Sequence, residues 1–398
     1  MSARKGFVRG IALALSALVL VACGGQQQQT PSAPASSTPA PAAAAAEPKV
    51  LKLGVIQPLT GAIAFGAVAA ANGHKLAVEE INAKGIKIGN DIYKIELVIE
   101  DDKATPKDTA AAAQKLIDRD KVPLIMGSFT SSSTFAAAEV ADRAGIPIIS
   151  PLSSSSKLTN SGLKWFFRGR VTTDNNVAAA AKFFSTGLGY KKIAMLAIND
   201  DWGRGDTTAF PAEWAKLGVE VTATEYFNNG DTNFYPLLRK IAGTSPDALF
   251  VTASTEPAAM IFKQAREVAP NLPLLTSGGI DPAQTIKLAG AEPLEGIYFW
   301  SVDGPSNDTH KAFEKKYKDK FGQDAISNSK SAYDVTYIVA QAFERAGTTD
   351  PDKLREAMLK TQYKGLMGDY NFDERGESFL KMNYGLFKNG TFEILPKQ

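Results

Sequence analysis

The chain has 398 residues, of which 44% are hydrophobic and 22% are charged. These values are ordinary for a globular protein and allow two or three domains with a sizeable core. The net charge of +2 comes from 44 basic and 42 acidic residues. It predicts no nucleic-acid partner, because binding to DNA needs a clustered basic surface. One cysteine and two histidines exclude an intrachain disulfide and a metal site built mainly from Cys and His.

The N-terminus carries a pattern typical of export. Basic residues precede an apolar run at 11–21, which is too short to span a bilayer and is typical of a secretory signal. The run ends in LVAC, whose last residue is Cys23. This ending resembles the lipobox of bacterial lipoproteins, which implies that residues 1–22 are a signal peptide and that Cys23 becomes the lipidated N-terminus. The alternative is an ordinary signal peptide with an incidental cysteine.

A segment of low complexity follows, with the sequence GGQQQQTPSAPASSTPAPAAAAAEP at 24–48. It has no aromatic residue and no apolar periodicity, so it cannot bury a core. We therefore expect 23–48 to be a disordered linker. Together with the lipid on Cys23, it predicts an extracytoplasmic protein anchored at a membrane surface.

From residue 50 onward, short apolar runs alternate with segments of helical periodicity. The first series predicts strands and helices in turn at 50–56, 66–83, 92–100, 106–118, 122–126, 132–144 and 146–149. The second series begins with a helix and predicts elements at 177–186, 193–198, 206–217, 219–225, 235–242, 248–252, 257–269 and 274–276. This alternation predicts two α/β units with mostly parallel sheets covered by helices on both faces.

The C-terminal part predicts one more strand at 296–301, three helices and a final pair of strands. The helices are predicted at 309–321, 329–346 and 351–359, and the strands within 384–395. Asn389-Gly390 gives a hairpin signal between these last two strands.

Two serine-rich loops follow neighbouring predicted strands of the first unit. They are MGSFTSSST at 126–134 and SPLSSSS at 150–156. In open α/β sheets, ligands bind outside the carboxyl ends of the strands. Each loop also precedes a helix, where unpaired N–H groups and the positive end of the helix dipole attract anions. The loops therefore predict a carboxylate site, with helix caps and solvated loops as the alternative.

The usual signatures of catalysis are missing from the sequence. It contains no Gly-x-Ser-x-Gly elbow and no Walker A loop, and Gly203-Arg-Gly205 lacks the third glycine of a dinucleotide fingerprint. Two carboxylate pairs, Asp101–Asp102 and Asp200–Asp201, are interpreted as solvated loop residues. We expect neither an enzyme nor a bound cofactor or metal. An enzyme would need a nucleophile and base that the sequence does not offer.

Several motifs, in this order and spacing, resemble the type I periplasmic binding proteins of the leucine/isoleucine/valine-binding branch, which serve ABC importers. They include GVIQPLTGAIAFG, DDKATPKDTAAAAQKLI, GSFTSSST, PIISPLSSSSKLT, NDDWGRG and GDYNFDERGE. The resemblance covers the chain from about residue 50 to the end. It implies two Rossmann-like lobes that are joined by a three-segment hinge and close on a small ligand.

The resemblance also implies boundaries and partners. Lobe 1 is expected at 49–170 plus 301–370, and lobe 2 at 171–300 plus 371–398. The expected partners are an ABC permease and a small-molecule ligand, an amino acid of the branched-chain type or a related small carboxylate. The protein is expected to be a monomer. A ligand sensor, in which closure acts on a signalling partner, is the alternative outside transport.

The resemblance places the ligand's carboxylate at the two serine loops and aromatic residues beside its side chain. The residues expected around the ligand are Phe65, Ser131, Ser132, Leu152, Ser153, Ser154, Trp202, Thr255, Gly278, Asp281 and Tyr333.

One position departs from the pattern of amino-acid binders. The acid that holds the ligand's ammonium group in that branch is replaced here by Gly278. A buried ammonium needs a partner charge, which could come from Asp281, Glu256, Asp201 or Asp334. If none of these supplies it, a keto acid, an aromatic acid or an amide without an ammonium group would fit better.

Overall fold

The computed structural model describes residues 47–172, 174–301 and 307–395. Residues from Glu47 onward form one compact unit, and the predicted signal peptide, Cys23 and most of the linker lie outside the described residues. Within this part of the chain, no helix combines the length and hydropathy needed to cross a membrane.

The first sheet has six strands in the order β2-β3-β1-β4-β5-β6. Its pairs are parallel except for the antiparallel pair β2–β3. The strands are β1 (Lys49–Gln57), β2 (Ile86–Ile88), β3 (Asp91–Asp101), β4 (Ile125–Gly127), β5 (Ile148–Ser150) and β6 (Phe166–Arg168).

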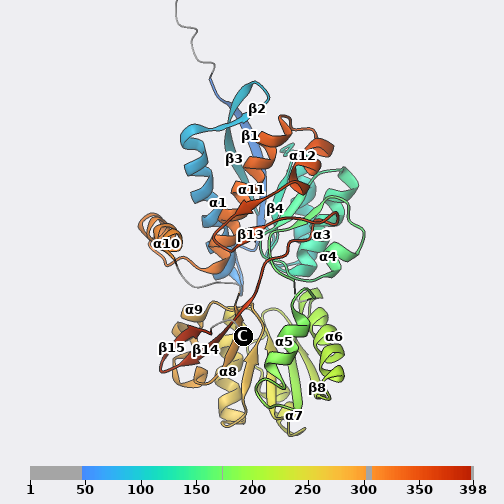
Figure 1. The fold of residues 1–398 in the computed structure, drawn as a ribbon, viewed down its shortest axis with the longest axis vertical. Helices are drawn as coiled ribbons and strands as arrows, with labels where there is room; N and C mark the ends of the chain where they lie inside the picture. Colours follow the sequence, from blue (N-terminus) through green and yellow to red (C-terminus); the bar gives the residue numbers. More distant parts are fainter. Residues whose placement is uncertain (1–46, 173, 302–306, 396–398) are drawn as a thin grey trace, which may run out of the picture. The chain divides into compact units, whose positions relative to one another are not determined.

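Helices cover both faces of this sheet, and we call the assembly lobe 1. Apolar residues of α1, α11 and α12 share one core with β1, and α1 and α11 pack side by side (Figure 1). Residues of α2 and α3 form the core on the opposite face. The helices of lobe 1 are α1 (Ala64–Lys84), α2 (Pro106–Asp118), α3 (Ser131–Ala144), α4 (Lys157–Asn160), α10 (Asp308–Phe321), α11 (Ser327–Ala346) and α12 (Pro351–Leu359).

The second sheet has seven strands in the order β15-β14-β11-β10-β9-β7-β8. Its five strands β8, β7, β9, β10 and β11 are parallel, and β14 and β15 add an antiparallel hairpin at the edge next to β11. The strands are β7 (Lys192–Ile198), β8 (Glu220–Phe227), β9 (Ala248–Thr252), β10 (Leu274–Thr276), β11 (Tyr298–Ser301), β14 (Asn383–Lys388) and β15 (Thr391–Ile394).

This sheet is also covered on both faces, and we call the assembly lobe 2. The cores on its two faces draw on α5 and α6 on one side and on α7, α8 and α9 on the other. The helices are α5 (Val177–Phe184), α6 (Asp201–Lys216), α7 (Tyr235–Ala242), α8 (Thr255–Val268), α9 (Pro282–Ala289) and the short 3₁₀ helix η1 (Glu292–Leu294). The predicted pair of mostly parallel α/β units is confirmed.

The strand order creates the same crevice in each lobe. β1 lies between β3 and β4, and the helices after β1 and β4 cover opposite faces of the sheet. β7 lies between β8 and β9 in the same way, with α6 and α8 on opposite faces. Loops diverge at such switch points, which is where ligands of open α/β sheets bind.

The chain leaves lobe 1 later than the predicted boundary at 371. Phe372 and Leu380 still lie in the core of lobe 1, beyond the small sheet of β12 (Tyr363–Lys364) and β13 (Asp369–Tyr370). Met382 contacts the cores of both lobes, and β14 then joins lobe 2. The last crossover is therefore the short stretch around Met382.

Several elements differ from the sequence prediction. The short elements β2, β6, α4, α9, β12 and β13 were not predicted, since they carry only two to eight residues of periodic signal. The helix predicted at 206–217 begins at Asp201, because Asp200 caps it by accepting the N–H groups of Trp202 and Gly203 at 2.9 Å. Asp200 is thus a helix cap at the inner end of the loop, and its interpretation as a solvated residue was wrong.

Gly203 lets α6 begin directly against β7, because a Cβ at this position would overlap the carbonyl oxygen of Ile198. We expect Gly203→Ala to lower the free energy of unfolding by about 1–3 kcal/mol, the usual effect of overpacking. Gly205→Ala is the matched control, since the nearest atom to its Cβ would be Ser155 Oγ at 4.0 Å. It should be neutral or stabilising by up to about 1 kcal/mol. Chemical denaturation measures both, and equal stability of the two variants would contradict the packing argument.

Candidate functional site

A cavity of about 320 Å³ lies where the switch points of the two sheets meet. Lobe 1 contributes the loops after β1, β3, β4 and β5, and lobe 2 contributes the loops after β7, β8, β9 and β10. The cavity is thus formed by the carboxyl ends of the strands, as the sequence predicts for α/β sheets.

The N-terminus of α3 forms one polar wall. Thr130 caps this helix, its Oγ1 accepting the N–H of Ser133 at 3.3 Å, and the first turn contains no acid. Ser131 and Ser132 occupy the first two helical positions and border the cavity. N–H groups at these positions have no partner within a helix, so this wall presents donors and the positive end of a helix dipole.

The loop after β5 forms the adjoining wall. Leu152 and Ser154 border the cavity. Ser153 is turned away, since its Oγ lies 3.1 Å from the carbonyl oxygen of Phe129 and 2.5 Å from Thr134 Oγ1. The N–H of Ser155 donates to Ser131 Oγ at 3.2 Å, which joins the two serine loops. Hydroxyl and N–H donors of both loops therefore converge on one end of the cavity.

Large apolar residues border much of the remaining surface. They include Phe129, Trp202, Met260 and Met382, together with the core residues Phe227 and Trp300. The Trp202 ring lies against Gly279, where a Cβ would overlap it. The cavity is therefore amphipathic, with donors at one end and aromatic and methionine side chains around the rest, the usual composition of a small-molecule site.

Two carboxylates border the cavity among the described residues, Asp200 and Asp231. Asp200 is half-buried and borders the cavity. Its burial raises the pKa of Asp200 to about 6. The hydrogen bonds from the N–H groups of Gly203 and Trp202 favour the charged form and lower the pKa, but their effect is smaller. Asp231 is exposed and accepts the N–H of Asn228 at 2.7 Å.

A guanidinium borders the cavity near Gly278. Arg170 is buried, and its Nη2 donates to the Gly278 carbonyl oxygen at 3.2 Å. A Cβ at Gly278 would lie 3.0 Å from the Trp300 carbonyl oxygen, so a side chain there has little room. Where amino-acid binders were expected to carry an acid, this chain therefore brings a cation and a tight backbone contact.

The two lobes touch beside the cavity. The N–H of Asp201 donates to Ser132 Oγ at 2.9 Å, and the Asp201 carboxylate pairs with Lys157 at 3.3 Å. Glu256 of α8 interacts with the N–H of Phe65 in α1, while burial raises the pKa of its carboxyl. Ser132 and Asp201 are therefore occupied by contacts between the lobes.

Six of the eleven predicted site residues border the cavity. They are Ser131, Ser132, Leu152, Ser154, Trp202 and Gly278.

Five predicted residues lie outside the cavity lining, each for a local reason. Phe65 and Ser153 take part in the contacts just described. Thr255 Oγ1 accepts the N–H of Asp281, and Asp281 in turn caps α9 by accepting the N–H of Gln284. Tyr333 faces the α1 side of α11, where its hydroxyl donates to Glu80 at 2.6 Å.

The acids that were considered as partners for a ligand's ammonium group make other contacts. Asp334 is fully buried in lobe 1 and accepts the N–H groups of Leu366 and Met367 at 2.9 Å. Asp201, Glu256 and Asp281 hold the contacts given above. Asp200, Arg170 and Trp300 were not predicted as site residues, and the only signal for Asp200 was its position directly after a predicted strand.

Comparison with known proteins decides the family. The sequence profile of the family described as "Periplasmic binding protein" matches residues 50–387. The chain belongs to the periplasmic binding protein family. A relative named "Amino acid binding protein" from Pseudomonas aeruginosa is 30% identical over 350 residues, which cover 86% of this chain and 92% of the relative.

Solved structures agree with this assignment of the periplasmic binding protein fold. A leucine-binding protein, LivK, from Thermotoga maritima is 29% identical, with a TM-score of 0.80 over 87% of this chain and 98% of that chain. The substrate-binding protein LivJ from Streptococcus pneumoniae, solved with isoleucine, is 28% identical with a TM-score of 0.78, covering 87% and 99% of the two chains. The predicted family and fold class are confirmed.

The pKa of Asp200 gives this periplasmic binding protein a testable pH dependence. A carboxyl whose pKa is raised on folding stabilises the folded state below its unfolded pKa, and this contribution is lost as the pH rises towards about 6. In Asp200→Asn the amide oxygen can keep both cap bonds. We expect the free energy of unfolding to fall less steeply between about pH 4 and pH 6 in this variant than in the wild type.

The measurement is a series of denaturation midpoints across this pH range without ligand. Asp247→Asn is the control, because N–H groups of Lys191 and Lys192 lower the pKa of this exposed carboxyl and move its titration below the range. An identical slope for Asp200→Asn and the wild type would contradict the assignment.

Proposed function

We propose that the protein is the extracytoplasmic substrate-binding component of an ABC importer and that it binds a small amino acid of the branched-chain type, or a related small carboxylate, between its lobes. The family and the ligand named for the LivJ structure support this proposal. The observation that carries it is the convergence of Ser131, Ser154 and the α3 N-terminus on one end of an otherwise largely apolar cavity.

The proposed role requires binding and closure rather than chemistry. Ligand contacts made by both lobes favour the closed arrangement, and a permease that recognises this arrangement receives the ligand. Anchoring through a lipid on Cys23 and a monomeric state belong to the same proposal. They are supported by the lipobox-like LVAC sequence and by the family resemblance, respectively.

The ligand's carboxylate is proposed to lie between Ser131 and Ser154. Hydrogen bonds to a charged group contribute about 1.5–3 kcal/mol each, so we expect the double variant Ser131→Ala/Ser154→Ala to bind at least about 100-fold more weakly. Titration calorimetry with L-leucine, L-isoleucine and L-valine measures the effect. Ser133→Ala is the control, since Ser133 is buried one residue beyond the cavity wall and its hydroxyl has no hydrogen-bond partner among the described residues. Unchanged affinity in the folded double variant would exclude this placement.

The ammonium group of an amino acid would be held by Asp200. The two cap bonds use its Oδ1, and its surface reaches the cavity. Removing one partner of a desolvated charge pair weakens binding by about 2–5 kcal/mol. Asp200→Asn should therefore weaken L-leucine binding by at least about 30-fold, with little change for the corresponding keto acid.

A second candidate ligand is a keto, aromatic or other small carboxylate without an ammonium group. The observation that favours it is the pair Gly278 and Arg170, where the expected acid is absent and a guanidinium borders the cavity. A thermal-shift screen of Glu47–Gln398 with amino acids, their keto acids, benzoate and short amides separates the two. Ligand at about 100 times its Kd stabilises by about 2.7 kcal/mol. Shifts with keto or aromatic acids alone would exclude the amino-acid reading.

A further inference from the structure

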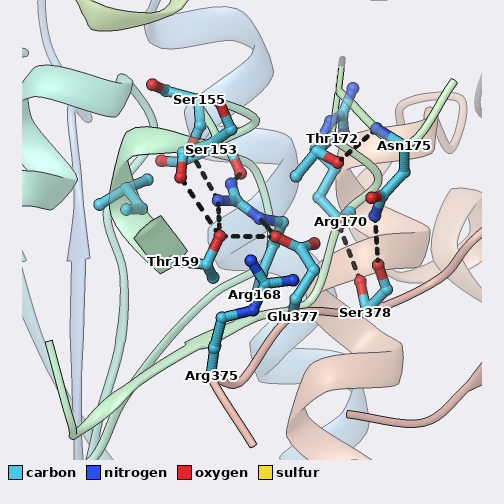
Figure 2. Close-up of polar contacts among 12 residues, drawn as sticks. Ser153, Ser155, Thr159, Arg168, Arg170, Thr172, Asn175, Arg375, Glu377 and Ser378 are labelled. Carbon is cyan, nitrogen blue, oxygen red and sulfur yellow. Dashed lines mark hydrogen bonds and ion pairs between the residues drawn. The ribbon is translucent and has the colours of Figure 1, made fainter. Parts of the chain in front are cut away.

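A buried arginine stands directly behind the loop after β5. Arg168, the last residue of β6, has no exposed surface. Figure 2 shows its guanidinium among the oxygen atoms of this loop. Nη1 donates to the Ser153 carbonyl oxygen and Nη2 to the Ser155 carbonyl oxygen, each at 2.6 Å. One planar group therefore fixes two peptide units of the loop that carries Ser154.

The direction of these bonds matters for the cavity. In a trans peptide the C=O and the following N–H point in opposite directions. Because the Ser153 carbonyl points at Arg168, the N–H of Ser154 points away from it, and Ser154 borders the cavity. Within the described chain this N–H has no protein acceptor. It is thus presented as a donor on the wall where the carboxylate is proposed to lie.

We propose that Arg168 is a positioning residue for ligand binding: it orients and polarises the Ser153–Ser154 peptide so that its N–H receives the ligand's carboxylate. The inference rests on the proposed function. A charge-assisted bond to the carbonyl end strengthens the donor at the other end, because hydrogen-bonded groups polarise one another in a low dielectric. Arg168 acts on the ligand through this peptide and makes no contact with the cavity itself.

Glu377 holds the guanidinium in place. Arg168 Nε donates to Glu377 Oε2 at 3.1 Å, and the same oxygen accepts Thr159 Oγ1 at 2.7 Å (Figure 2). The backbone N–H of Arg168 donates to the Gly376 carbonyl oxygen at 2.8 Å, and Ser378 Oγ donates to that of Arg170 at 2.8 Å. The network therefore links the loop to residues 168–170 and 376–378. These two segments lie close to the points where the chain passes from lobe 1 to lobe 2.

The buried ion pair is by itself weak evidence for a stabilising role. A buried ion pair is often no better than apolar residues of similar volume, because desolvation of the two charges offsets their attraction. Arg266 shows the purely structural use of an arginine in this fold. It donates to the carbonyl oxygens of Pro270, Leu272, Pro293 and Glu295 in lobe 2, and it does not border the cavity.

The test compares Arg168→Lys with Arg266→Lys in the folded body. Lysine keeps the charge but cannot donate to both carbonyls in the planar geometry of a guanidinium. The probes are L-leucine and L-leucinamide, which differ only in the carboxylate. In Arg168→Lys we expect leucine to bind at least about tenfold more weakly and leucinamide to change little, so that the preference for the carboxylate collapses. Arg266→Lys should keep the wild-type preference.

A second variant covers the possibility that Arg168→Lys does not fold. Glu377→Gln is nearly isosteric and keeps an oxygen for Thr159, but its neutral amide holds the guanidinium less firmly. It should show the same loss of carboxylate preference to a smaller extent. The inference is overturned if a folded variant at either position loses the same proportion of its affinity for leucine and for leucinamide. It is also overturned if neither affinity changes. In both cases the role of Arg168 is purely structural.

Hydrogen exchange of the ligand-free protein provides a readout that needs no ligand. In Arg168→Lys, the backbone N–H groups of 152–156 should exchange at least about tenfold faster than in the wild type, whereas Arg266→Lys should leave their exchange rates unchanged. Unchanged exchange in Arg168→Lys would overturn the inference. If the wild type binds neither probe nor any other carboxylate of the screen, the proposed carboxylate site fails, and the exchange rates still decide whether Arg168 orders the loop.

Discussion

The site depends on one topological constraint, which is that the first parallel strand of each sheet lies between the second and the third. The chain must then leave β1 and β4, and likewise β7 and β9, towards helices on opposite faces. A crevice opens at each divergence, and ligands of open α/β sheets bind in such crevices. Since the two crevices face each other, one ligand can contact backbone from four strand ends at once. Some polar residues of those loops, such as Ser131 and Ser154, border the cavity, whereas Ser132 and Asp201 also join the two lobes.

The electrostatics of the cavity follow from two helix N-termini that meet across it. Both α3 and α6 begin at the cavity, and each would attract an anion. The chain neutralises α6 with its own carboxylates, since Asp200 caps it and Asp201 occupies its first turn. In α3 the cap is the neutral Thr130, and no acid lies in the first turn. This asymmetry supports the proposal that an anionic ligand group lies on the lobe 1 side, and a cationic group, where the ligand has one, on the lobe 2 side near Asp200.

The α/β architecture and the position of the two serine-rich loops could be predicted from the sequence, because both follow from local patterns. Apolar runs that alternate with helical periods predict parallel sheets, and serines directly after a strand must lie at its carboxyl end. The direction of an individual side chain depends on tertiary packing. Tyr333 lies on a correctly predicted helix but turns to Glu80. Asp102, interpreted as solvated, is fully buried and accepts Thr109 Oγ1 at 2.9 Å. The sequence around Tyr333 and Asp102 does not indicate that Glu80 and Thr109 are their hydrogen-bond partners.

Gly278 shows why the ligand class is a property of several residues together. A carboxylate side chain there would press on the Trp300 carbonyl oxygen and would reach Met382, whose Cε lies 3.4 Å from the Cβ position. It would also stand beside the guanidinium of Arg170, which already donates to the Gly278 carbonyl oxygen. An acid introduced at this position would thus crowd the Trp300 backbone and would lie near the guanidinium of Arg170. The absence of an acid at Gly278, the close approach of the Trp300 backbone and the nearby guanidinium are mutually consistent. Among the described residues, the half-buried carboxylate that borders the cavity is Asp200, on the switch-point loop of lobe 2.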